Sequence, residues 1–377
     1  MSRFPVLPPM VGAAMLSVGV LTVVPAPAAA APEGTLIAEI AQPDGWRGMG
    51  NGSVVEYWTT GSDGSPRRAS GALFLPAGRA PAEGWPIMVF EHGTSGLAAG
   101  CGRDDDIEHP GQEDPLVGAM VSRGFAVLAP DYLGLGRFGG GPHPFLETRT
   151  EADATIDLVR AVRRTHSELS RRWGVIGSSQ GGHAALAAAH AAATAVPELD
   201  FRGVVAIDPA SNVDRLLLPL GPDGPDMPDP VHRALMAMVL EAMRIARPDA
   251  EVDSYLTPLG RSVLDDIATM CSKQIVGRIG DLTLPELLSR PLSQGPFAAA
   301  VTAYLGVPTD GYRAPILLLL NVTDIVVFSP LHADLVAQLT ANRVDFRTVV
   351  GAGMHAQLNS RMRQALDGFL ATVAALR

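Results

Sequence analysis

A short strand, a glycine-rich turn and an alanine-rich helix follow one another, and their junction reads Trp173-Gly174-Val175-Ile176-Gly177-Ser178-Ser179-Gln180-Gly181-Gly182-His183. Within it, residues 177–181 match the pattern G-x-S-x-G. In that pattern a tight turn lifts the serine hydroxyl above the edge of a sheet, and the glycines are there because side chains would not fit. The alternative is a glycine-rich turn without chemistry. Because a strand precedes the turn and a helix follows it, we predict that Ser179 is an exposed nucleophile.

Short apolar runs alternate with helical patterns on both sides of this junction. This alternation is typical of a mostly parallel sheet flanked by helices, which is the α/β class. The expected strands are 53–58, 72–75, 86–91, 125–129, 173–176, 204–207, 315–320 and 346–350. The expected helices of the core are 151–167, 183–195 and 358–376.

Residues 212–312 interrupt this rhythm because they contain no strong strand pattern. The stretch opens with several prolines and becomes helical at 231–245. We predict a helical cap insertion above the carboxyl ends of the strands, where α/β sheets bind ligands. The core is then made of residues 31–211 and 313–377. Met236, Met238 and Met243 are candidates to line an acyl tunnel, because methionine adapts to irregular apolar shapes; packing in the core is the alternative.

A serine hydroxyl needs a base, and His355 is the best candidate among the nine histidines. It lies between the last predicted strand and the last predicted helix, and it preserves the chain order Ser, Asp, His. Asp324 follows the strand 315–320 and is predicted to orient the base. Asp208 ends the preceding strand and is the rival acid.

Two backbone N–H groups are predicted to receive the negative charge that develops on a substrate oxygen. One belongs to Gln180, at the start of the helix after Ser179. The other belongs to Thr94, in the loop Glu91-His92-Gly93-Thr94-Ser95-Gly96 that follows the strand 86–91.

The bulk composition restricts partners and location. A formal net charge of −10 disfavours a nucleic-acid partner. No metal-binding or dinucleotide motif stands out, so we expect neither a metal nor a cofactor.

Residues 1–30 have the pattern of a signal peptide cleaved near Ala30, with Arg3 ahead of an apolar stretch and small residues after it; a membrane anchor is the alternative. In an exported protein the pair Cys101 and Cys271 suggests a disulfide, although two separate buried thiols remain open.

Several stretches resemble the secretory lipase family, which includes fungal type A lipases and actinobacterial secreted lipases. They are His92-Gly93-Thr94 with Cys101, then residues 129–136, then His143-Pro144-Phe145-Leu146, and then residues 177–185. The resemblance implies an α/β-hydrolase with a helical cap, a Ser-Asp-His triad, carboxylic-ester substrates including triacylglycerols, and a Cys101–Cys271 disulfide.

We therefore expect a secreted serine esterase or lipase that acts on lipid or small-molecule esters, with transient contact with lipid interfaces. A secreted peptidase or polyester hydrolase would have the same fold and triad. A lipid-binding relative without catalysis is the other alternative, and it would require the loss of a triad member.

Overall fold

The computed structural model describes residue 1 and residues 33–42, 49–50, 52–102, 115–139 and 141–376. Among these residues a nine-stranded sheet has the order β1-β2-β3-β5-β4-β6-β7-β8-β9. The strands are β1 (Leu36–Gln42), β2 (Gly52–Thr60), β3 (Pro66–Phe74), β4 (Trp85–Glu91), β5 (Ala126–Pro130), β6 (Leu169–Ser178), β7 (Asp200–Ile207), β8 (Ile316–Asn321) and β9 (Phe346–Gly351).

Strand direction divides the sheet into two parts. β1, β2, β3 and β5 pair antiparallel in that order, whereas β5, β4, β6, β7, β8 and β9 all pair parallel. The mostly parallel sheet predicted from the alternating pattern is confirmed. Because parallel strands end at one edge, the loops after β4, β6, β7, β8 and β9 meet there, as ligand sites in such sheets require.

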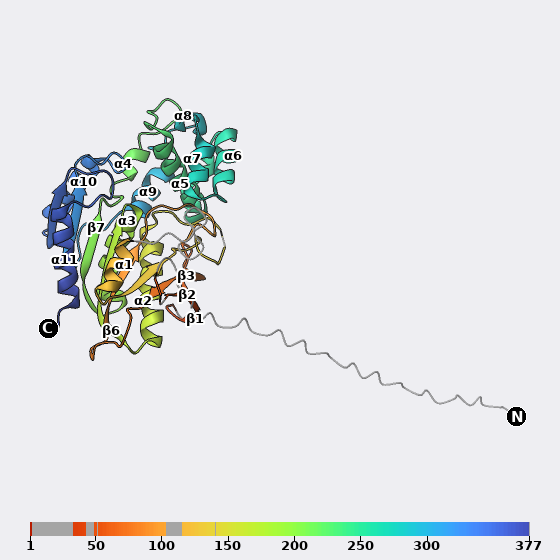
Figure 1. Cartoon of the computed structure of the whole chain (residues 1–377). Coiled ribbons are helices and arrows are strands. Elements are labelled where there is room, and N and C mark those ends of the chain that lie inside the picture. Colours follow the sequence, from red (N-terminus) through yellow and green to blue (C-terminus); the bar gives the residue numbers. More distant parts are fainter. Residues whose placement is uncertain (2–32, 43–48, 51, 103–114, 140, 377) are drawn as a thin grey trace. The chain divides into compact units, whose positions relative to one another are not determined.

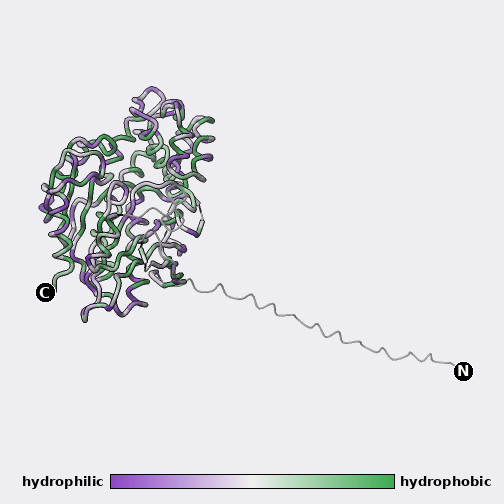
Figure 2. The backbone as a smooth tube through the Cα atoms, in the orientation of Figure 1, coloured by the Kyte–Doolittle hydropathy of each residue, from purple (hydrophilic) through white to green (hydrophobic). Residues whose placement is uncertain are grey.

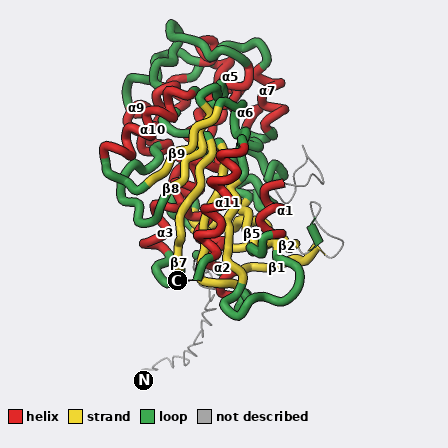
Figure 3. The backbone as a smooth tube through the Cα atoms, turned by 60° about the vertical axis from the view of Figure 1, so that its left-hand side comes forward, coloured by secondary structure: helices red, strands yellow, loops and turns green. Residues whose placement is uncertain are grey.

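Helices cover both faces of the sheet, as Figure 3 shows from the side of α11. Buried side chains of α1 (Pro115–Ser122) and α11 (Ser360–Ala374) join one apolar cluster with the strands. Those of α2 (Thr148–Thr165), α3 (Gln180–Ala195) and α10 (Ser329–Ala341) join another. The strands β4 and β8 are buried along their whole length. Figure 2 shows the distribution of apolar and polar residues along the backbone. Burial of this apolar area supplies most of the favourable free energy of folding.

The chain between β7 and β8 is helical, and Figure 1 shows α5 to α8 gathered beyond one end of the sheet. Its helices are α4 (Asp214–Leu217), α5 (Pro230–Ala246), α6 (Pro258–Ile267), α7 (Ser272–Ile279), α8 (Leu284–Leu287) and α9 (Pro296–Leu305), with short 3-10 helices at Pro248–Ala250 and Val252–Tyr255. These helices share one apolar cluster with Leu97, Phe145 and Leu331 of the core loops and α10. The insertion is therefore packed onto the core by apolar contacts as well as by its chain connections.

The predicted signal peptide, residues 1–30, lies outside the described residues apart from Met1. In the described part of the chain, none of the helices is both long enough and apolar enough to cross a membrane.

Candidate active site

Ser179 stands in a strained turn between β6 and α3. Its φ of 57° and ψ of −122° are rarely adopted by a residue with a side chain, and such strain is concentrated at functional sites. The flanking glycines make the turn possible. A Cβ added at Gly177 would lie 2.1 Å from the Gly181 carbonyl oxygen, and one added at Gly181 would lie 2.0 Å from that of Glu91. The packing of this turn against β4 thus explains both glycines of the pattern.

His355 and Asp324 lie together at the same edge of the sheet. The Nδ1 atom of His355 is 2.7 Å from Oδ2 of Asp324, whose side chain is fully buried. An ionised carboxylate only accepts hydrogen bonds, so Nδ1 carries the proton. In the neutral ring Nε2 is then an acceptor, and among the described residues it has no hydrogen-bond partner. This is the tautomer that a general base requires.

Asp324 is held as a carboxylate. Its other oxygen, Oδ1, accepts the backbone N–H groups of Val326 and Val327 at 2.8 and 3.1 Å. Burial alone would raise its pKa, but hydrogen bonds from His332 and His355 outweigh burial and hold the pKa well below its usual range. The Asp324 carboxyl group therefore stays ionised next to the predicted base His355.

Asp208, the rival acid, has a different set of partners. It accepts the N–H of Asn321 at 2.7 Å, the side-chain amide of Asn321 at 2.7 Å and the N–H of Ala356 at 2.9 Å. These contacts join the ends of β7 and β8 to the loop that carries His355. The structure brings Asp324 to the predicted base His355, whereas Asp208 connects the strand ends to the loop that carries it.

A cavity of about 550 Å³ contains the predicted nucleophile and base. Ser179 and His355 line it together with Gly93 and Thr94 of the loop after β4. The opposite wall comes from the insertion and is largely apolar, with Val231, Ala234, Leu235 and Met238 of α5 and Val276 of α7. An apolar wall in a cavity that also contains the predicted nucleophile suits the hydrocarbon part of a substrate.

Of the three methionines predicted to line an acyl tunnel, the structure places one in this cavity. Met238 lines it. Met236 and Met243 lie instead in the apolar cluster of the insertion, 3% and 0% exposed. Being seven residues apart, Met236 and Met243 share one face of α5, and Met238 lies on another. The sequence alone does not show which face packs against the core.

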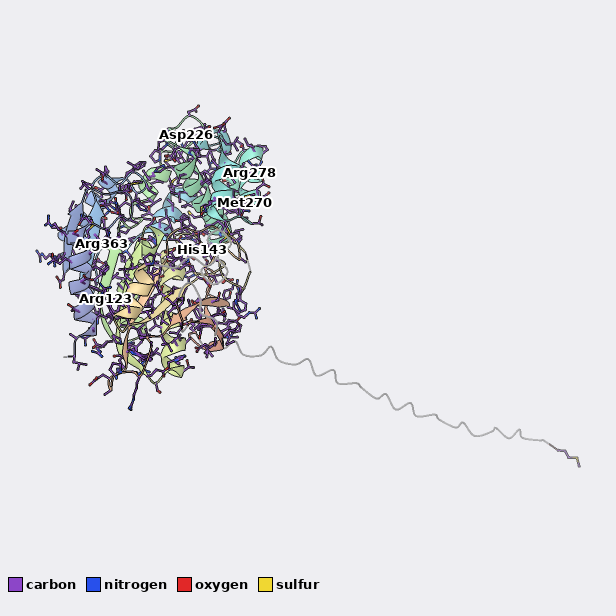
Figure 4. The ribbon with its side chains drawn as sticks, viewed as in Figure 1. Arg123, His143, Asp226, Met270, Arg278 and Arg363 are labelled. Atoms are coloured by element: carbon purple, nitrogen blue, oxygen red, sulfur yellow. A yellow bond between two sulfur atoms is a disulfide. The ribbon has the colours of Figure 1, made fainter. Side chains whose placement is uncertain are left out.

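The loop after β4 is fastened from both sides. On the core side the Tyr132 hydroxyl donates to the His92 carbonyl at 2.9 Å. On the other side the loop pairs with the insertion, where the N–H of Leu97 donates to the carbonyl of Met270, a residue labelled in Figure 4, at 3.0 Å. The N–H of Ser272 returns a bond to Ser95 at 2.9 Å. The structure also contains the predicted Cys101–Cys271 disulfide. The predicted oxyanion loop is thus tied directly to the insertion.

The backbone N–H and the side chain of Gln180 have different surroundings. Its backbone N–H is at the first position of α3, where helical N–H groups have no partner within the helix. Its side chain is buried and donates to Oε1 of Glu151 at 2.8 Å and to Nε2 of His143 at 2.7 Å. Burial lowers the pKa of His143 to about 3, which leaves its Nε2 free to accept. Figure 4 labels His143.

This buried polar network continues away from the nucleophile and was not predicted from the sequence. Oε2 of Glu151 is 2.6 Å from Nδ1 of His183, and both side chains are fully buried. Burial also raises the pKa of the neighbouring Glu91, at the end of β4, to about 8. These residues hold the first turn of α3 and the end of β4, so they fix the backbone on both sides of the predicted oxyanion site.

Asp208, Asp324 and His332 bring ligand-type atoms within 4.8 Å of one another, which raises the question of a metal. The oxygens of Asp208 already accept three hydrogen bonds, and both oxygens of Asp324 accept bonds as well. The donor set is therefore occupied by protein groups and fits a hydrogen-bonded cluster better than a cation.

Comparisons by sequence point to lipases. A family model described as secretory lipase matches residues 109–282. A Mycobacterium tuberculosis protein named a probable inactive lipase is 22% identical over 249 residues, which cover 63% of this chain and 53% of that protein. The chain thus spans about half the length of this curated relative.

Solved structures of the same fold are lipases and other hydrolases. Candida antarctica lipase A superposes with a TM-score of 0.71 at 17% identity, over 92% of this chain and 84% of its own. A putative hydrolase from Legionella pneumophila superposes with a TM-score of 0.70 at 18% identity, over 91% of this chain and 100% of its own. The rice cell wall degrading esterase LipA from Xanthomonas oryzae superposes with a TM-score of 0.68 at 19% identity, over 91% of this chain and 97% of its own. The chain therefore has the α/β-hydrolase fold, and its sequence resembles the secretory lipases, whose family model it matches over residues 109–282.

Proposed function

We propose that this protein is a serine carboxylic-ester hydrolase, a lipase or esterase, with Ser179 as nucleophile, His355 as base and Asp324 as the orienting acid. One observation carries the proposal. The buried Asp324 carboxylate accepts the Nδ1 proton of His355, so that Nε2 of the same ring can act as an acceptor. His355 lines the same cavity as the strained Ser179. The match to the secretory lipase family supports the same reaction class.

The proposed reaction has two halves. Nε2 of His355 takes the proton of Ser179 as its oxygen attacks the ester carbonyl, and Asp324 stabilises the imidazolium that forms. The oxyanion receives hydrogen bonds from the backbone N–H groups of Thr94 and Gln180. His355 then gives its proton to the departing alcohol, which leaves an acyl ester on Ser179. A water molecule, activated by the same histidine, hydrolyses that ester and restores the serine.

For the substrate we propose esters with a hydrocarbon acyl chain, including acylglycerols. The support is the apolar wall that α5 presents to Ser179, through Leu235 and Met238 among others. Residues 212–312 would then act as a cap that covers the site and sets the preferred chain length. A secreted peptidase or polyester hydrolase is the alternative with the same fold, and parallel panels of esters and peptides distinguish them.

A catalytically silent, lipid-binding protein is the second candidate, because the curated relative is named a probable inactive lipase. A fluorophosphonate probe separates the two, since it reacts covalently only with an activated serine. We expect labelling that peptide mapping assigns to Ser179, and hydrolysis of p-nitrophenyl esters by the same preparation. Ser179→Ala should abolish both, with a loss of about 10⁴-fold or more in kcat by analogy with other triads.

The matched control is Ser178→Ala, which changes the neighbouring serine of the same turn and should still be labelled at Ser179. If the wild-type protein takes no label, the binding protein is the better description. If Ser179→Ala keeps a tenth of the activity, another residue is the nucleophile.

We also infer that the protein is exported and loses residues 1–30. The disulfide and the resemblance to secretory lipases support this inference. Amino-terminal sequencing of protein recovered from the culture medium should begin close to Ala31, and an intact residue 1 in that fraction would contradict it.

A further inference from the structure

A second histidine touches the proposed catalytic acid. His332 lies on α10 and is 3% exposed, with its Nε2 atom 3.2 Å from Oδ2 of Asp324. That oxygen is the one that accepts the Nδ1 proton of His355 at 2.7 Å. A single carboxylate oxygen therefore bridges two imidazole rings, one of which belongs to the proposed base.

The surroundings of His332 decide where its proton lies. Nε2 faces Asp324 and also Oδ1 of Asp208, at 3.6 Å, and an ionised carboxylate accepts but does not donate. Nδ1 is buried and has no hydrogen-bond partner among the described residues. The proton consequently lies on Nε2, and His332 donates to Asp324.

The groups around His332 come from three neighbouring parts of the sheet edge. Asp208 at the end of β7 and Asp324 after β8 face its Nε2 atom, and His355 after β9 is linked to it through Oδ2 of Asp324. Asp208 is already held by Asn321 and Ala356, so its carboxyl group has a fixed position beside the His332 N–H. The cluster thus places one N–H between two buried carboxylates, directly behind the base.

This arrangement affects how strongly Asp324 attracts a proton. Each hydrogen bond donated to a carboxylate stabilises its charged form and makes it less basic. Without the bond from His332, Oδ2 would be a stronger acceptor, and it would hold the charged form of His355 more tightly. A base that stays protonated cannot take the proton of the nucleophile.

We propose that His332 is a positioning residue for the proposed hydrolysis: its Nε2–H orients Asp324 and limits its basicity, so that Asp324 does not hold the proton that His355 takes from Ser179 too tightly. This inference rests on the proposed function for its catalytic meaning. The hydrogen bonds on which it is built are independent of that function.

The main test is the pH dependence of kcat/KM for a soluble p-nitrophenyl ester with His332→Leu, which removes the donor and keeps an apolar side chain of similar size. We expect the acid limb of the profile to move to higher pH by about 0.5 to 1 unit. On the acid limb kcat/KM at a fixed pH should therefore fall about three- to tenfold, mainly through kcat, since the loss affects the base and not the acyl cavity. His332→Gln, whose side-chain amide has a similar reach, should restore most of kcat and the position of the limb.

The matched control is His166→Leu. His166 is also hydrogen-bonded by two carboxylates, Glu39 and Glu168, but these belong to β1 and to the turn before β6. Its replacement should leave the acid limb of the activity profile unchanged. If His332→Leu does not fold, His332→Met removes the donor with a more adaptable side chain.

A second measurement keeps the inference separate from the proposed function. NMR titration of the His355 ring in a Ser179→Ala background should show protonation at higher pH when His332 is replaced by Leu or Met. That shift together with an inactive wild-type protein would reject the proposed function and keep the hydrogen-bond role. Unchanged titration in a folded donor-free variant, or an acid limb that does not move, would overturn the inference about His332.

Discussion

Two buried aspartates end neighbouring strands of this sheet, and their hydrogen bonds give them different tasks. Asp324 contacts the ring of His355, whereas Asp208 is occupied by Asn321 and Ala356. The residue type is the same at both positions, so only the partners distinguish them. Exchange of each carboxylate for an amide of the same shape therefore separates catalysis from stability.

Asp324→Asn is expected to lower kcat by about 10³- to 10⁴-fold, because an amide next to His355 favours the wrong tautomer of the ring. Asp208→Asn should mainly reduce the free energy of unfolding, by about 1–3 kcal/mol, since it weakens charge-assisted hydrogen bonds to two loops. Ester hydrolysis and thermal unfolding of both variants provide the comparison. A severe loss of kcat in Asp208→Asn at unchanged Tm, with a mild effect of Asp324→Asn, would exchange the two assignments.

At the residue scale, the sequence predicts a site residue when that residue lies in the loop after a recognisable strand. Ser179, Asp324 and His355 could be selected because each lies in the loop or turn that follows a predicted strand, and the structure brings the last two into contact. His332 and Glu151 carry no such signal. They lie inside helices, and their roles arise only when α10 and α2 pack against the sheet.

At the scale of elements, a strand can be predicted from the sequence when nearly all of its residues are apolar. The fully buried β4 and β8 were predicted almost to the residue. β1 was missed because it is a half-exposed edge strand, and edge strands carry a weak pattern. β6 was predicted too short, since it begins with polar residues that include Arg171 and Arg172. The guanidinium of Arg172 bonds to the Ala374 carbonyl, a contact that a sequence does not reveal.

Helix α5 is the element on which chain-length preference is expected to depend. Leu235 is half-buried in the cavity wall, so Leu235→Trp should shorten the space for an acyl chain. Each buried methylene contributes about 0.8 kcal/mol, so the loss of room for two should lower kcat/KM for the longest ester relative to butyrate about tenfold. A graded series of p-nitrophenyl esters measures this shift.

Ile245→Trp is the matched control, because it places the same side chain on the exposed end of the same helix. Met238→Trp is a second variant within the cavity wall. Unchanged chain-length profiles in both cavity variants would mean that the acyl chain binds elsewhere.

The disulfide joins an element of the core to an element of the insertion, since Cys271 is also the residue before α7. A double Cys101→Ser/Cys271→Ser variant should have a lower Tm. The chain-entropy model gives an upper limit of about 5 kcal/mol for a loop of this length. Reducing agent should lower the Tm of the wild type and leave that of the double variant unchanged. Equal Tm values for the two oxidised proteins would show that the bridge adds no stability.

For the whole molecule, Glu91 and His166 are among the groups whose raised pKa makes stability fall as the pH rises. Burial raises the pKa of Glu91 from its usual 4.5 to about 8. The folded chain keeps this proton while the unfolded chain gives it up, so the contribution falls as the pH rises through that range. The hydrogen bond to Glu39, with a second one to Glu168, raises the pKa of His166 from 6.5 to about 9. Its contribution is fully present below pH 6.5 and is lost as the pH approaches 9.

We therefore expect the Tm of the protein to fall between pH 6.5 and 9. Glu91→Gln, which imitates the protonated carboxyl, should flatten the part of the curve below pH 8. His166→Leu should flatten the part between pH 6.5 and 9. Differential scanning calorimetry across this range tests both, and parallel curves for all three proteins would contradict the pKa shifts.

Asp208 joins backbone groups at the ends of β7 and β8 to the loop after β9, and this junction has a consequence for the growing polypeptide. A ribosome delivers the nucleophile turn well before it delivers Asn321, Asp324 and His355. Until the segment after β9 has reached its place, Asp208 lacks its hydrogen bond from Ala356, and Ser179 lacks the proposed base His355. Because domains of this size fold as units, the nascent chain stays chemically silent through most of its synthesis. Under the proposed function, the cell that makes the protein meets an active ester hydrolase only after the final strand and helix are in place.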